Sequence, residues 1–159
     1  MRYAILAALL PLPALAAGHV TEVWETWDRP DYDFVIEVPD HIFDIRRKGD
    51  QSVSWETSDG DITLDVSSFF GGDDAAPDEV LSLRQDSLPF RVVTYEASGN
   101  NWAVVSGYED DARTEIFYER FEAGPSGLWA GYVLRWPVTR RDDVDDLTGR
   151  IGRSLSVRR

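Results

Sequence analysis

Apolar and polar residues alternate most regularly between positions 52 and 67 of the chain. Two alternating runs flank Asp59-Gly60, and Asp-Gly is favoured in two-residue hairpin turns because both positions accept positive φ. A shift of the pairing by one residue would turn every apolar side chain to the other face, so the alternation selects one register. We therefore predict a β-hairpin that pairs Thr57 with Ile62, Trp55 with Leu64, and Val53 with Val66.

Two further strands are predicted ahead of this hairpin. The segment Phe34–Pro39 places Phe34, Ile36 and Val38 on one face and ends at a proline. The segment Val20–Trp27 is interpreted as another strand, at the edge of the sheet.

The second half of the chain predicts a four-strand meander over Val92–Ala97, Trp102–Glu109, Thr114–Glu122 and Leu128–Trp136, with turns rich in Gly, Asn, Asp and Pro. The last strand carries apolar residues on both faces, which indicates a central strand covered on two sides. A trial register across the last turn pairs Phe117 with Val133, Ile116 with Leu134, and Glu115 with Arg135.

Two helices complete the predicted fold. The first begins at Pro77, after a loop at residues 71–74, and ends near Leu88. At the start of the second helix, Thr139 and Asp142 are three positions apart and form a variant of the capping box. Its apolar residues recur at helical spacing and form a single stripe: Val144, Leu147, Ile151 and Leu155. These elements predict an α+β domain, an antiparallel β-sheet of six or seven strands with helices packed on it.

The N-terminal residues 1–16 have the pattern of a cleaved signal peptide. Arg2 gives a positive start, residues 3–10 are apolar, and Ala14-Leu15-Ala16 matches the small-x-small pattern that signal peptidase reads. The apolar run is shorter than the about 20 residues of a membrane-spanning helix, and prolines follow it. We expect cleavage after Ala16, export of the product, and a single domain over residues 17–159.

The composition narrows the classes of function. The chain has 0 Cys, which excludes disulfides, thiolate metal sites and cysteine nucleophiles. Its 16 Lys and Arg against 29 Asp and Glu give a net charge of −13, or −14 once Arg2 is removed. Nucleic acid and anionic lipid are therefore poor partners. Phosphate-binding glycine patterns do not occur, so we expect no cofactor.

Catalytic and metal-ligating patterns are weak. The chain has His19 and His41, and neither accompanies a Gly-x-Ser-x-Gly nucleophile elbow. Asp59-Gly-Asp61 lacks the further ligands of a calcium loop. The Asp residues at 142–146 complement the positive end of a helix dipole without an ion. The residues by themselves indicate no catalytic, cofactor-binding or metal site.

Two pairs of residues remain as candidates. Glu115 and Glu119 share a strand face, and two carboxylates among aromatic residues are the machinery of glycoside hydrolysis. A cross-strand ion pair between Glu115 and Arg135 would explain the first of them structurally. Trp24 and Trp27 are three residues apart, which does not fit strand alternation. Either they cap the edge of the sheet or they form an exposed interaction patch.

Five motifs occur in an order that resembles one group of proteins: Phe34–Pro39, Asn101–Gly107, Ile116–Arg120, Val133–Pro137 and Arg150–Leu155. Through them, residues 30–157 resemble small, uncharacterised exported proteins of alphaproteobacteria, similar in architecture to the PsbP-like fold. The resemblance implies a Gram-negative periplasm and an antiparallel sheet sandwiched by helices. It transfers no catalytic residues, and its link to binding and assembly-assisting roles is fold analogy.

The function we expect is a non-enzymatic periplasmic binding or assembly-accessory domain that acts on a protein of the periplasm or cell envelope. One alternative is a hydrolase of envelope glycans that works through carboxylates. Another is a small-molecule binder that uses the space between sheet and helix. Convergence of two carboxylates in one aromatic-lined cleft would favour the hydrolase.

Overall fold

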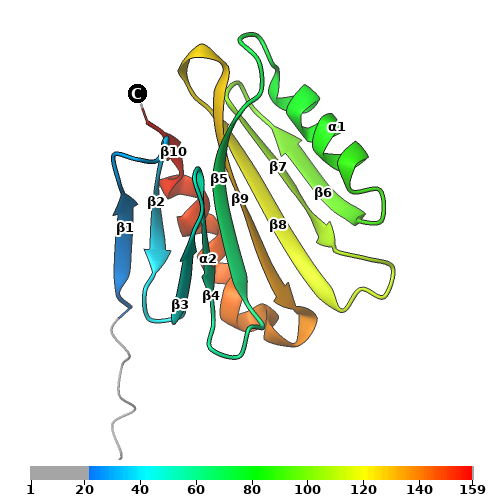
Figure 1. Ribbon diagram of the computed structural model, residues 1–159. Helices are drawn as coiled ribbons and strands as arrows, with labels where there is room; N and C mark the ends of the chain where they lie inside the picture. The colour runs from blue at the N-terminus through cyan, green and yellow to red at the C-terminus, as the bar shows by residue number, and fades with distance from the viewer. Residues whose placement is uncertain (1–21, 159) are drawn as a thin grey trace, which may run out of the picture.

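The computed structural model describes residues 22–158, which form two antiparallel sheets and two α-helices (Figure 1). The helices are α1 (Pro77–Ser87) and α2 (Arg141–Ser154), and two short 3-10 turns are η1 (Pro125–Gly127) and η2 (Val138–Arg140). The strands are β1 (Trp24–Asp28), β2 (Phe34–Pro39), β3 (Ile45–Lys48), β4 (Ser52–Glu56), β5 (Thr63–Phe70), β6 (Val92–Ser98), β7 (Trp102–Tyr108), β8 (Glu115–Ala123), β9 (Leu128–Pro137) and β10 (Ser156–Val157). The predicted signal peptide lies outside the described residues. Within residues 22–158, no helix is long and apolar enough to cross a membrane.

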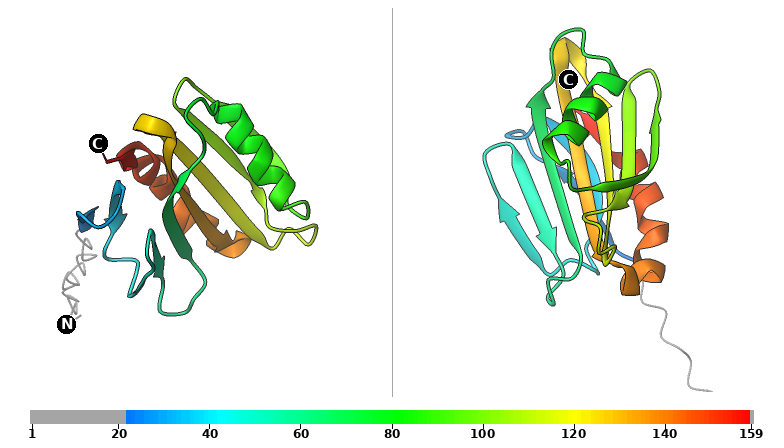
Figure 2. Two further views of the ribbon diagram at one scale, coloured as in Figure 1. Left: turned by 45° about the horizontal axis from the view of Figure 1, so that its top comes forward. Right: turned by 90° about the vertical axis from the view of Figure 1, so that its right-hand side faces the viewer.

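The larger sheet has seven strands in the order β3-β4-β5-β9-β8-β7-β6. β9 lies at its centre, and most of its side chains are buried, which confirms the predicted central strand. α1 packs on one face of this sheet and α2 on the other (Figure 2). The predicted α+β class and the four-strand meander are both confirmed.

The predicted hairpin is confirmed as β4–β5, with Trp55 opposite Leu64 and Val53 opposite Val66. Its turn differs from the prediction. The backbone N–H of Gly60 donates to the Thr57 carbonyl at 2.9 Å. Gly60 has a φ of +78°, whereas Asp59 is not in the positive-φ region.

The loop between the paired residues Thr57 and Ile62 therefore holds four residues rather than the expected two. The side chain of Asp59 fixes its tip, since its Oδ1 accepts the Thr57 hydroxyl at 2.6 Å and the Asp61 N–H at 3.1 Å. The register survives because both turn types bring the same strand residues opposite each other.

The trial register for β8 and β9 is wrong by two residues. The observed pairs are Phe117 with Arg135, Ile116 with Trp136, and Glu115 with Pro137. The reason is a longer turn, which contains η1 between the paired residues Ala123 and Trp129. A shift of two residues leaves each side chain on its original face. Phe117 and Val133 accordingly still share one core cluster.

A second sheet of three strands, in the order β1-β2-β10, was not foreseen as a separate unit. Its central strand β2 buries Phe34, Ile36 and Val38, which confirms their predicted common face. β10 is only two residues long and pairs Ser156 with Val35. So short a strand leaves no alternation in the sequence by which it could be recognised.

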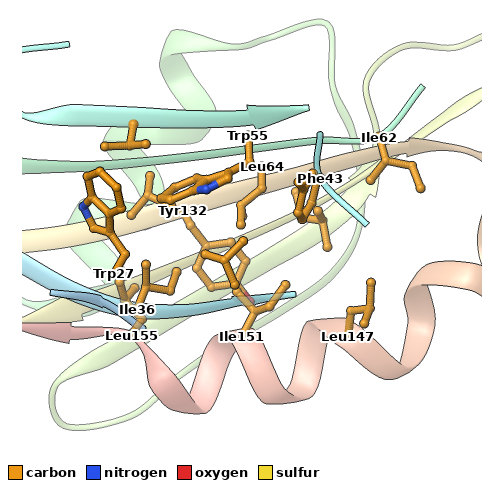
Figure 3. Packing of buried hydrophobic residues seen from close by; sticks show 14 of the residues in the cluster. Trp27, Ile36, Phe43, Trp55, Ile62, Leu64, Tyr132, Leu147, Ile151 and Leu155 are labelled. Carbon is orange, nitrogen blue, oxygen red and sulfur yellow. The ribbon is translucent and has the colours of Figure 1, made fainter. Parts of the chain in front are cut away.

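The larger core lies between the two sheets and α2 (Figure 3). It contains the predicted α2 stripe of Val144, Leu147, Ile151 and Leu155. The predicted cap of this helix is wrong: Thr139 lies in η2, and no side chain caps the first turn. Instead Arg140 Nε donates to Asp143 Oδ2 at 2.6 Å, so an ion pair rather than a hydroxyl marks this end of α2.

The smaller core lies on the opposite face of the seven-stranded sheet, under α1. The helix contributes Val80 and Leu81, and the sheet contributes Ala103, Val105, Phe117, Phe121, Trp129 and Val133. α1 begins at Pro77 as predicted, and Glu79 Oε2 accepts the backbone N–H of Ala76 at 3.1 Å. This face is the one on which charged groups and hollows gather.

Candidate functional site

A chain of ion pairs crosses the sheet face beside α1. Glu119 receives two arginines: Arg84 Nε donates to its Oε1 at 2.8 Å, and Arg91 Nη1 to its Oε2 at 2.6 Å. Arg91 also donates two hydrogen bonds to Glu109, at 2.8 and 2.9 Å. Arg135 Nε continues the chain, 2.7 Å from Glu109 Oε1. The chain thus ties α1 and the loop after it to the middle of the sheet.

The centre of this chain is removed from solvent. The side chains of Arg91 and Glu119 are 5% and 4% exposed, and the Arg91 guanidinium lies 4.1 Å from the centre of the Phe117 ring. Buried charges of this kind are tolerated only when they are paired and hydrogen-bonded. Each carboxylate here meets that condition by accepting hydrogen bonds from two arginines.

The pKa values of two carboxyl groups on this face are shifted in opposite directions. Burial raises the pKa of Glu109, but hydrogen bonds from Arg91 and Arg135 outweigh it and hold the pKa below the ordinary value. For Glu115 the balance is reversed, since burial and then the negative charge of Glu109 raise its pKa.

The predicted cross-strand pair of Glu115 with Arg135 is wrong. The shifted register places Glu115 opposite Pro137, and Arg135 bonds Glu109 and Asp65 instead. Glu119, the second candidate carboxylate, has both oxygens occupied by arginines. Glu115 alone of the two keeps a carboxyl group free of partners within the described residues, and its candidate partner Glu119 is engaged by two arginines, so the two residues do not supply the pair of carboxyl groups that glycoside hydrolysis uses.

A groove runs between α1 and the end of β5, with a volume of about 380 Å³. Its apolar lining comes from Phe69, Phe70, Val80, Leu83 and Phe121, and Arg84 is its one charged lining residue. Phe69 and Phe121 meet edge to face, with ring centres 5.9 Å apart. Apolar walls with a single convergent charge are typical of small-molecule sites.

The outer edge of the sheet on the other side of α1 is apolar as well. β6 is an edge strand, and most of its residues are exposed. Phe90, Val93 and Tyr95 are 59%, 36% and 56% exposed, so three large apolar side chains stand within six positions of this edge. Val93 pairs with Gly107 and Tyr95 with Ser106, so these two side chains lie on opposite faces of the sheet and flank the edge from both sides. Large apolar side chains exposed along one edge strand are candidates for an interaction surface.

The two tryptophans of the candidate interaction patch lie at the edge of the smaller sheet. Trp27 is 1% exposed and packs its ring against Trp55 with centres 5.5 Å apart, while Arg29 and Arg46 lie 4.9 and 5.0 Å from its ring centre. Trp24 is half-buried beneath the Arg150 guanidinium, 3.9 Å from its ring centre. The burial of Trp27 favours the edge-cap interpretation, and a role of the pair in partner binding stays a prediction.

The remaining candidates are dispersed. His41 lies in the exposed loop after β2, with its Nδ1 3.2 Å from the Val23 carbonyl oxygen, and His19 lies outside the described residues. Asp59 and Asp143 both bind Arg140. Across residues 22–158, no group of three or more potential His, Asp or Glu ligands is placed to hold a metal ion.

Sequence reasoning missed Arg84, Arg91 and Glu109. They lie in α1, in the loop after it and directly after β7, and they meet only because α1 lies across the sheet. One local signal was present: Arg84 follows Val80 at helical spacing, on the side of α1 that faces the sheet. A charged residue at such a position needs a buried partner.

No protein-family model and no curated protein matches the chain. Among solved structures, the chain is similar to the solution structure of the cyanobacterial PsbP protein (CyanoP) from Synechocystis sp. PCC 6803. The TM-score is 0.61 at 12% sequence identity, over 88% of this chain and 95% of that one. The chain therefore has the PsbP-like fold that its motifs implied. At 12% sequence identity, the similarity shows the fold alone.

Proposed function

We propose that the chain is an exported, non-enzymatic binding or assembly-accessory domain that docks a protein partner along the β6 edge. The observation that carries the proposal is the exposed apolar edge of Phe90, Val93 and Tyr95 on an otherwise strongly acidic protein. Edge strands offer unpaired backbone groups to a second chain, and proteins usually protect them with charges or bulges. β6 has both features, an irregularity between Val93 and Tyr95 and the exposed Glu96, but Val93 and Tyr95 are exposed beside them.

The chemistry of the opposite side of α1 supports a binding rather than a catalytic role. The carboxylates nearest the groove are engaged by arginines, which stabilises structure and leaves no free acid–base pair there. Export is supported by the signal-peptide pattern of residues 1–16. The protein would then meet its partner in the periplasm or at the cell envelope.

Site-directed photocrosslinking in the native host tests the docking edge. The photoreactive residue p-benzoylphenylalanine replaces Tyr95 in one strain and Val138, an apolar residue of η2 that is 38% exposed, in a control strain. We expect one envelope protein to crosslink at position 95, to be absent at position 138, and to be lost when Val93→Asp is added. Identical adducts at both positions would contradict the proposal.

The export half of the proposal has its own measurement. The intact mass of protein from the native host should correspond to a chain that begins at Ala17. Retention of residues 1–16 would contradict export while leaving the docking edge to be judged by the crosslinks.

A further inference from the structure

The groove between α1 and β5 shares no residue with the proposed docking edge. Val80 and Phe121 of its lining belong to the smaller core, whereas Phe70, Leu83 and Arg84 do not. On α1 it is lined by Val80, Leu83 and Arg84, which recur at the i, i+3 and i+4 spacing of one helix face. Leu83 and Phe70, on opposite walls, are each 69% exposed. Two large apolar side chains so exposed across a hollow are costly in water and gain from an apolar occupant.

The charge in this groove has unused hydrogen-bonding capacity. Arg84 donates its Nε to Glu119, and within the described part of the chain its two terminal nitrogens have no hydrogen-bond acceptor. Its side chain is 35% exposed, so these nitrogens can reach a ligand. Along the whole chain of ion pairs the three arginines are balanced by three carboxylates, Glu119, Glu109 and Asp65. Recognition of an anion in the groove therefore rests on the two free terminal nitrogens of Arg84 and not on an excess of positive charge.

We propose that this groove binds a small amphipathic carboxylate, of the class of medium-chain aliphatic acids. The aliphatic chain lies between Phe70 and Leu83 over the Phe69–Phe121 pair, and the carboxylate accepts hydrogen bonds from the terminal nitrogens of Arg84. Guanidinium and carboxylate form paired, charge-assisted hydrogen bonds, which neutral or cationic head groups cannot reproduce. The volume of about 380 Å³ lies near the lower end of the range for small-molecule sites.

The site is independent of the proposed docking edge, because it lies on the β5 side of α1 and shares no residue with Phe90, Val93 or Tyr95. Each can therefore fail without the other. The variant Tyr95→Asp should leave the groove intact and serves as a folded control.

Amide NMR spectra of ¹⁵N-labelled protein starting at Ala17 test the proposal, with octanoate, octanol and octylammonium as probes. We expect saturable shifts from octanoate at residues 69–71 and 80–87, and binding at least about tenfold tighter than for the other two probes. Arg84→Gln should weaken octanoate binding by about tenfold or more, and Arg84→Lys by less, because Lys keeps the charge but loses the planar fork. Arg84→Gln still donates to Glu119 and leaves the Arg91 pair in place, so the fold is retained.

Three outcomes would overturn the proposal. Octanol binding as tightly as octanoate would show an apolar hollow without anion recognition. The absence of saturable shifts below about 5 mM octanoate would show no site of useful affinity. A short peptide with a C-terminal Leu carboxylate binding more tightly than octanoate would assign the groove to the end of a polypeptide instead. Arg153→Gln, which removes an exposed arginine of α2, is the matched control and should change nothing.

Discussion

The two faces of the seven-stranded sheet are covered by different physical means. On the α2 side, a continuous apolar stripe and the three-stranded sheet enclose a large core that includes Trp27, Trp55 and Tyr132. On the α1 side, the helix contributes only two buried apolar residues, Val80 and Leu81, and a chain of ion pairs does much of the anchoring. The α1 side is also the one flanked by the groove and by the exposed β6 edge.

This difference separates stability from binding within one small domain. Apolar burial stabilises without regard to pH, and it closes the surface that it covers. Paired charges hold α1 in place while leaving hollows and unsatisfied donors around it. A surface held in this way can present ligand-binding groups without opening the main core, which is why we place both proposed sites there.

The largest expected effect is on the α2 side. Trp27→Ala removes a side chain that is 1% exposed and should lower the free energy of unfolding by about 3–5 kcal/mol. Urea unfolding measures it, and the loss should be the same at pH 5 and pH 8. Trp24→Ala, at a half-buried position, should cost clearly less. If a folded Trp24→Ala variant no longer bound a protein that the wild type binds, the result would support the interaction patch instead.

The next effect is on the ion-pair chain. Arg91→Met keeps most of the apolar stem but removes one of the two arginines that bind each of Glu119 and Glu109, and we expect a loss of about 3 kcal/mol in the free energy of unfolding. The loss stands at the lower end for a broken buried pair, because Glu119 keeps Arg84 and Glu109 keeps Arg135. Arg153→Met, at an exposed position, should stay within about 0.5 kcal/mol of the wild type. Equal effects of the two substitutions on the free energy of unfolding would show that the ion-pair chain does not anchor α1 to the sheet.

Acid should weaken the α1 side before the α2 side. The pKa of Glu109 is lowered in the folded protein, so its stabilisation is complete above the ordinary value of 4.5 and is lost as pH falls through the folded pKa. Hydrogen exchange at pH 6 and pH 3.5, corrected for intrinsic rates, should show α1 losing protection relative to α2. Parallel loss in both helices would mean that the charges contribute nothing local.

The smallest effect is expected at Glu115. Partial desolvation of its exposed side chain, and then the negative charge of Glu109, raise its pKa, so its ionised form is less favourable in the folded protein than in the unfolded chain. Glu115→Gln should therefore increase the free energy of unfolding, by less than about 1 kcal/mol. The gain should fade as pH drops below the ordinary value, where the carboxyl group of the unfolded chain is protonated too. A destabilised Gln variant at pH 7 would show that Glu115 has a favourable partner after all.

Much of the fold could be predicted because neighbouring residues encode it. The alternation around Asp59-Gly60 fixed the β4–β5 register, since one buried face tolerates no slip by a single residue. The same argument cannot detect a slip by two, which preserves every face, and there the β8–β9 prediction failed. The conformation of a turn such as η1 depends on contacts with a distant loop, for example Gly127 against Gly72.

The sequence by itself determined all the described strands except β3 and β10, the two helices, the apolar stripe of α2 and the α+β class, because periodicities of two and of about 3.6 residues are local properties. Only the tertiary structure decided which charges meet. Arg84 and Glu119 are separated by 35 positions, and Arg135 and Asp65 by 70. Ionic contacts at such separations follow from how α1, β5, β8 and β9 pack against one another, and the pattern of neighbouring residues does not encode that arrangement.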